Sequence, residues 1–134
     1  MTYFPDLSDY TYLPQRNPML TIGWLDRAHA FTTGPLPPQV IATLTTLATH
    51  QHNITRGVHN CHFCDEESPL KLPADVRRGY VFLGMGELHV LAPNGTTYSA
   101  PSLIIHYILQ HNYQPPTEFI CAVRFGRPCP LNCD

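Results

Sequence analysis

Residues 87–98, ELHVLAPNGTTY, place a turn between two short runs of strand-forming residues. Asn94-Gly95 is the strongest short-range signal for a β-hairpin, because both residues accept the positive φ angles of a tight turn. We therefore predict two antiparallel strands joined by this turn. The predicted strands are Glu87–Leu91 and Thr96–Tyr98, with a further candidate at Tyr80–Leu83.

Three helices are predicted around the hairpin, and each begins at proline, which is well accommodated in a first helical turn. The first follows Pro37-Pro38 and ends near Gln51, with apolar residues at helical spacing. The second starts at Pro101 and ends near Asn112, and a third, short helix begins at Pro115-Pro116. The apolar residues are Val40, Ile41, Leu44, Leu47 and Ala48 in the first helix, Leu103, Ile104, Ile105, Tyr107 and Ile108 in the second, and Phe119, Ile120 and Val123 in the third.

The remaining segments show little periodicity. Residues 1–35 are rich in Pro, Tyr and Asp, and we expect them to be extended and packed by aromatic side chains, with a short strand at Leu20–Leu25. Residues 53–76 are predicted to form a loop, and residues 126–134 an irregular tail. We find no internal repeat, so we predict one α+β domain over residues 1–134, with a small antiparallel sheet of about three to four strands and about three helices. The aromatic residues are Tyr3, Phe4, Tyr10 and Tyr12.

The composition indicates a folded protein without affinity for membranes or nucleic acid. Apolar residues make up 43% of the 134 residues and charged residues only 13%, the opposite of a disordered chain. A formal charge of −2 and only eight Lys and Arg residues leave no clustered positive charge for a phosphate backbone or a membrane surface. No apolar stretch approaches the roughly 20 residues that span a bilayer. The N-terminal residues lack the features of a signal peptide, so we expect a cytoplasmic location.

The stretch GVHNCHFC, residues 57–64, contains a Cys-x-x-Cys pair, Cys61 and Cys64, which predicts a metal site. Two intervening residues let one tight turn aim both sulfurs at an ion about 2.3 Å away, as in tetrahedral zinc sites. The competing interpretations are two unligated cysteines and a redox dithiol. A redox dithiol needs a lowered thiol pKa, whereas the acidic run Asp65-Glu66-Glu67 disfavours a thiolate.

A closed zinc site needs four ligands, so Cys61 and Cys64 need two partners. The loop can bring His59 round to the ion, and the simpler alternative is a surface histidine. His106 leans toward the core from the second predicted helix, and its alternative is a buried histidine bonded to a backbone carbonyl. His111 is five residues further on, roughly 140° around the helix, so we expect the two not to bind one ion together easily.

The C-terminal tail offers a different completion of the site. Cys129 and Cys133 would join the cysteine pair in an all-thiolate site that ties the tail to the loop. The alternative is a flexible tail with two exposed thiols. Cys121, between Ile120 and Ala122, is expected to pack in the core.

Several motifs run in a specific order through nearly the whole chain, up to about Val123. They are YFPDLS at 3–8, IGWLD at 22–26 with His29, Gly57-x-His59-x-Cys61-x-x-Cys64, and Ala100-Pro101-x-Leu103-Ile104-x-His106-Tyr107 with His111, Tyr113, Pro115-Pro116 and Phe119. With this set the chain resembles a family of small uncharacterised, mostly bacterial proteins, defined as a domain of unknown function. The resemblance implies a shared fold and site but no activity. Because the tail beyond Gly126 lies outside the pattern, the resemblance favours His106 over Cys129 and Cys133 as a ligand.

These features predict a zinc-stabilised interaction or regulatory protein. One structural zinc per chain would be held by Cys61, Cys64, His59 and His106. The zinc would pin the predicted loop against the second helix. Exposed aromatic residues of the N-terminal segment would contact a protein partner or another copy of the chain.

An enzyme is the alternative, and the sequence favours it less. His-Glu-x-x-His is absent, and so is His-x-Glu ahead of Pro-Cys-x-x-Cys. Asp26 with His29 is the only other acid/base pair of interest, and we expect it to cap its own loop. The alternative functions are therefore a zinc- or Cys/His-dependent hydrolase and a nucleic-acid-binding zinc module, which the low positive charge disfavours.

Overall fold

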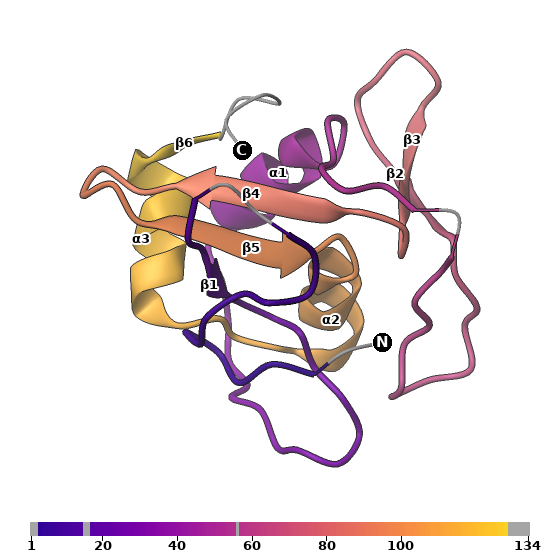
Figure 1. Ribbon diagram of the computed structural model, residues 1–134. Helices are drawn as coiled ribbons and strands as arrows, with labels where there is room; N and C mark the ends of the chain where they lie inside the picture. The colour runs from indigo at the N-terminus through magenta and orange to yellow at the C-terminus, as the bar shows by residue number, and fades with distance from the viewer. Residues whose placement is uncertain (1–2, 15–16, 56, 129–134) are drawn as a thin grey trace.

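A sheet of four short strands, in the order β1–β5–β4–β6, lies at the centre of the molecule (Figure 1). The computed structural model describes residues 3–14, 17–55 and 57–128. The strands of this sheet are β1 (Leu20–Thr21), β4 (Glu87–Leu91), β5 (Thr97–Pro101) and β6 (Arg127–Pro128). A second sheet pairs β2 (Leu70–Pro73) with β3 (Tyr80–Leu83). The described residues also form the helices α1 (Pro38–Leu47), α2 (Ile104–His111) and α3 (Thr117–Phe125), which confirms the α+β class.

The predicted hairpin is present. Strands β4 and β5 are antiparallel, with Leu91 opposite Thr97. In the turn, the Ala92 N–H donates to the Thr96 carbonyl at 2.8 Å, and Gly95 has a φ of 91°. L side chains rarely adopt such an angle, so glycine is the residue that this turn requires.

The sheet is mixed rather than purely antiparallel, because β1 lies parallel to β5. The strand predicted over Leu20–Leu25 covers only its first two residues, but the chain stays beside β5 beyond them. The Ile22 N–H and the Trp24 indole N–H both donate to the Ser99 carbonyl, at 2.9 and 3.0 Å. Both side chains are almost completely buried there, and the apolar surface they remove from water favours this pairing.

The segment 53–76, predicted as a loop, contains β2. Leu70 and Leu72 are half-buried whereas Lys71 and Pro73 are exposed, the period of two expected for a strand. A proline at the end of an edge strand costs no ladder hydrogen bond, so Pro73 is compatible with this pairing. Because β3 pairs with β2, the two strands predicted on either side of residues 84–86, β3 and β4, belong to different sheets.

Helices α1 and α3 lie behind the central sheet, and the N-terminal segment crosses its other face (Figure 1). Helix α1 packs on α3, and both contact β4. Helices α1 and α3 begin at or directly after the predicted prolines, whereas the predicted start of α2 at Pro101 is wrong, because Pro101 is the last residue of β5 and α2 begins at Ile104. Helix α1 ends at Leu47 rather than near Gln51. Side chains buried in this core include Ile22, Leu44, Leu88, Leu103, Ile104 and Phe119. No helix in the described part of the chain is long and apolar enough to cross a bilayer.

The aromatic N-terminal segment packs on Trp24. Phe4, Tyr10 and Tyr12 surround that ring, with centroids 5.6, 6.0 and 5.3 Å from it. Tyr3 differs from them, because it stacks on His29. The prediction that these aromatic residues pack the segment is therefore confirmed, with three of them on Trp24 and Tyr3 on His29.

Asp6 ties the same segment to two other parts of the chain. Its Oδ1 accepts a hydrogen bond from the Gly23 N–H at 2.9 Å, and its Oδ2 accepts one from the Tyr113 hydroxyl at 2.8 Å. Tyr113 is fully buried just after α2. Asp6 thus connects the N-terminal segment to the chain after β1 and to the chain after α2.

Candidate metal centre

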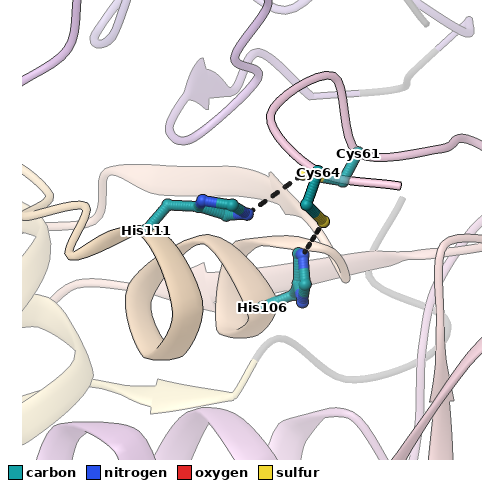
Figure 2. Close-up of side chains that lie close together, drawn as sticks. All are labelled: Cys61, Cys64, His106 and His111. Carbon is teal, nitrogen blue, oxygen red and sulfur yellow. Dashed lines mark hydrogen bonds between the residues drawn. The ribbon is translucent and has the colours of Figure 1, made fainter. Parts of the chain in front are cut away.

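Four side chains converge between the loop that precedes β2 and helix α2 (Figure 2). They are Cys61 and Cys64 from the loop and His106 and His111 from the helix, named here the cysteine–histidine cluster. The two sulfurs and one nitrogen of each histidine all lie within 4.8 Å of one another. Cys61 Sγ is 3.3 Å from His111 Nε2, and Cys64 Sγ is 3.4 Å from His106 Nε2. Two distant segments therefore direct four ligand atoms toward one centre.

The turn that carries the cysteines is held from two sides. On the inner side, the Phe63 N–H donates to Cys61 Sγ at 3.3 Å, and the Phe63 ring packs against Tyr107 of α2 with centroids 5.8 Å apart. On the outer side, Arg27 donates two hydrogen bonds to the His62 carbonyl, at 2.9 and 2.7 Å. The spacing of two residues and these contacts together aim both sulfurs at the helix.

His106 and His111 converge although they are five residues apart. The prediction that the two do not bind one ion together easily is wrong. Helix α2 is α-helical from Ile104 to His111, so the two residues start from different directions around its axis. Their side chains nevertheless extend toward the cysteines, and the two histidine ring centroids are 5.0 Å apart.

Burial disfavours the charged forms of two members of the cluster. It raises the pKa of the Cys61 thiol, and it lowers the pKa of the His106 imidazole, which the neighbouring His111 lowers further. A bound cation reverses this preference, because it stabilises thiolates and takes the lone pair of a neutral imidazole. Metal binding at this centre would therefore release protons.

The donor chemistry of the cluster fits zinc. Two thiolates and two imidazole nitrogens form one of the usual ligand sets of tetrahedral structural zinc sites. Sulfur ligands do not suit magnesium or calcium, which prefer oxygen. Two thiolate charges would also balance the charge of one divalent ion.

Of the predicted ligands, the structure brings together Cys61, Cys64 and His106. His59 lies outside the cluster: its Nε2 is 3.3 Å from the Tyr12 hydroxyl, and burial lowers the pKa of its imidazole. It links the loop to the N-terminal segment instead. His111, considered in the sequence only as an alternative, is the fourth member of the cluster. The available signal was its position on the same predicted helix as His106.

The other cysteines lie elsewhere. Cys121 is exposed on α3, so the prediction that it packs in the core is wrong. The buried face of α3 is formed by Phe119, Ala122 and Val123. Cys121 lies on the opposite face, because neighbouring residues of a helix point in different directions. Cys129 and Cys133 lie outside the described residues.

Asp26 and His29 form a pair at the surface. Asp26 Oδ1 is 2.7 Å from His29 Nδ1, and the His29 side chain is 50% exposed. The ring of Tyr3 stacks on the ring of His29, with centroids 3.8 Å apart. The two side chains close their own loop, as predicted.

A second group of polar side chains surrounds Glu87 in β4, and no sequence motif pointed to it. The Glu87 carboxylate is 3% exposed and accepts hydrogen bonds from the Tyr10 hydroxyl at 2.6 Å, the Asn53 amide at 3.0 Å and the Ser99 hydroxyl at 3.1 Å. His89 Nε2 lies 2.8 Å from the same carboxylate. These five residues are named here the Glu87 cluster. The available signal was the spacing of Glu87 and His89, two polar residues on one face of an otherwise apolar strand.

Comparison with known proteins assigns the chain to a family. A family model described as a domain of unknown function, DUF7919, matches residues 2–124. No curated protein and no solved structure matches the chain. The matched region includes the central hairpin and every residue of the cysteine–histidine cluster. The chain therefore belongs to the DUF7919 family, a domain of unknown function.

Proposed function

We propose that this domain is a zinc-stabilised interaction module with one structural zinc ion per chain. Cys61, Cys64, His106 and His111 would bind the ion, so that His111 takes the place assigned from the sequence to His59. The observation that carries the proposal is the convergence of four ligand atoms within 4.8 Å of one another. The paired cysteines and histidines are 42 and 50 residues apart in the sequence, so the fold has to bring them together.

A structural role is favoured by the number of protein donors. Four donors fill the tetrahedral shell of zinc, whereas catalytic zinc sites keep one position for water or substrate. Among residues 57–69, Cys61 is the only buried one, so this loop has almost no apolar core of its own. Zinc would supply the free energy that holds the loop against α2.

An interaction role is supported by apolar side chains on the same part of the chain. Ile54 is 65% exposed and Val58 is 41% exposed, although both are large and apolar. Zinc would fix the loop that displays them, and exposed apolar groups are typical of contact surfaces. The domain would then work by binding a protein partner or a second copy of itself.

Metal analysis of the purified protein tests the site. We expect about one zinc per chain, and Cys61→Ser and Cys64→Ser should each lose it because serine is a poor zinc ligand. Cys121→Ser is the matched control: its thiol is exposed on α3 and is not part of the cluster, so it should keep full zinc content. A chelator should lower the melting temperature of the wild type markedly and leave the two cluster variants unchanged. Full zinc content in both cluster variants would refute the proposal.

Sedimentation over a range of concentrations tests the contact surface. If the chain pairs with itself, Ile54→Ser combined with Val58→Ser should abolish the association. Phe125→Ser is the control, because Phe125 is equally exposed, at 66%, but lies on α3. A wild type that stays monomeric would exclude self-association and leave a different protein as the partner.

A further inference from the structure

The two ring nitrogens of His106 face different groups. Nε2 lies 3.4 Å from Cys64 Sγ, and Nδ1 lies 3.6 Å from Glu66 Oε2. The same carboxylate oxygen is 3.9 Å from Cys64 Sγ. The His106 side chain is 6% exposed and that of Glu66 is 61% exposed. The Glu66 carboxylate oxygen therefore lies next to both the Cys64 sulfur and Nδ1 of a buried ring, and it belongs to a largely exposed side chain.

A histidine that binds a metal needs a defined tautomer. When the Nε2 lone pair of His106 faces the ion, the ring proton has to be on Nδ1. A carboxylate beside Nδ1 accepts that N–H, fixes the plane of the ring and makes the ligating nitrogen more basic. The separation of 3.6 Å is less than half an ångström beyond the roughly 3.2 Å limit of such a hydrogen bond.

The surroundings allow the carboxylate to cover this distance. A cavity of about 250 Å³ adjoins His106 and is lined in part by Glu66, Lys71 and Gln110. Among the described carboxylates, Glu66 alone comes within 4.0 Å of either histidine of the cluster. It also follows Cys64 by two residues, so one turn of the loop delivers both a ligand and a carboxylate.

We propose that Glu66 is the positioning residue of the metal centre and accepts the Nδ1–H of His106. This inference rests on the zinc site proposed above. Glu66 belongs to the acidic run Asp65-Glu66-Glu67, and His106 is its proposed partner. Among the described residues, no carboxylate lies beside His111 in the way that Glu66 lies beside His106. Glu66 then sets how tightly the ion is held without touching it.

Zinc affinity, measured by competition with a chelator on the full chain, tests the role of Glu66. Glu66→Gln should bind zinc about tenfold more weakly, the lower end for loss of such an outer partner, because the Glu66 side chain is exposed. Glu67→Gln removes the same charge from the next residue and should bind zinc as the wild type does. The melting temperature of the metal-free protein should be the same for all three, which separates positioning from a general structural effect.

A second background isolates the contact with the ring. His106→Cys keeps four donors as a three-cysteine, one-histidine site, and it has no ring for Glu66 to orient. Adding Glu66→Gln in this background should not weaken zinc binding further. If the His106→Cys protein binds no zinc, the comparison of Glu66→Gln with Glu67→Gln in the otherwise wild-type chain still tests the role of Glu66.

The outcomes separate the two proposals. Equal affinities of Glu66→Gln and Glu67→Gln, or an equal loss in both backgrounds, would overturn the role of Glu66 and leave the zinc site standing. A wild type that binds no zinc would overturn both.

Discussion

The Glu87 cluster and the cysteine–histidine cluster place polar groups beside the core in two different ways. Around Glu87, hydroxyl and amide donors reach one carboxylate at 2.6 to 3.1 Å, so the carboxylate is fully engaged by the protein itself. Around Cys61 and Cys64, sulfur and nitrogen atoms meet at 3.3 and 3.4 Å, and hydrogen bonds of thiols are weak. The carboxylate of the first cluster is satisfied by protein donors, although His89 Nδ1 of that cluster is buried without a hydrogen-bond partner among the described residues. The second cluster, in contrast, would gain most from a cation.

This difference separates what holds the sheet from what holds the loop. The Glu87 cluster joins the N-terminal segment, the residues after α1 and both strands of the hairpin. The cysteine–histidine cluster joins one loop to one helix. We therefore expect damage to the first to affect the whole fold, and loss of metal from the second to release mainly the loop.

The largest effect is expected from Glu87→Ala. It leaves the Tyr10, Asn53 and Ser99 donors without their acceptor, and breaking a buried charged network costs about 3–5 kcal/mol. Urea unfolding followed by the fluorescence of Trp24, the single tryptophan, measures the loss. The loss should be equally large with a chelator present, because the two clusters share no residue.

Glu67→Ala is the control for this experiment, since its side chain is exposed and it should unfold as the wild type does. A Glu87→Ala protein with the urea midpoint of the wild type would show that the buried carboxylate contributes little. A loss that disappears on chelation would show instead that the clusters are coupled.

A smaller effect is expected at alkaline pH. Burial raises the pKa of the Tyr10 and Tyr113 hydroxyls, and their carboxylate partners, Glu87 and Asp6, raise it further. Unfolded tyrosines lose their protons near pH 10, while the folded protein keeps them. Stability is therefore complete below about pH 10 and falls as the pH rises above it, by up to about 1.4 kcal/mol per pH unit for each tyrosine.

Urea unfolding between about pH 8 and pH 11 measures this slope, and Tyr10→Phe is the matched variant. The two proteins share every other titrating group, so the difference in slope reports the Tyr10 hydroxyl alone. An unchanged slope in Tyr10→Phe would mean that this hydroxyl keeps an ordinary pKa despite its contact with Glu87.

The smallest effect is expected from Asp26→Ala, which breaks a polar pair in water rather than in the core. The His29 partner is half exposed, and water and salt screen such pairs. The urea midpoint should stay within the error of the measurement, and the zinc content should not change. A loss of stability as large as that caused by Glu87→Ala would show that this exposed pair contributes as much to stability as the buried Glu87 cluster.

Local sequence signals were sufficient for the hairpin and the helices. Asn94-Gly95 specifies its turn through backbone angles, and prolines mark the starts of α1 and α3, so neither signal depends on distant residues. Pro101 is the exception, since it ends β5 and α2 begins at Ile104. Strands β1 and β2 do depend on them, because Leu20 pairs with Tyr98 and Leu70 with Leu83. No pattern near either strand identifies its partner or its direction.

The candidate metal centre also contains some residues that the local sequence identifies and others whose positions depend on the fold. Cys61 and Cys64 could be predicted because the spacing itself carries the ligand geometry. The pairing of His106 and His111 could not, because whether two side chains five residues apart on α2 meet depends on the loop packed against them, which the spacing does not show. The Glu87 cluster could not be predicted either, since the spacing of two polar residues in a strand identifies a shared face but not what that face meets.

The hydrogen bond between Asp6 and Tyr113 has a consequence for folding on the ribosome, because it joins residues 107 positions apart. Most of the domain has to leave the exit tunnel before this contact can form, and contacts between distant residues are slow to form. At translation rates of 5–20 residues per second, His111 follows Cys64 after roughly 2–9 s. During that interval both cysteines have been translated without the histidines that converge on them, so the cysteine–histidine cluster cannot assemble until the whole of α2 has been made.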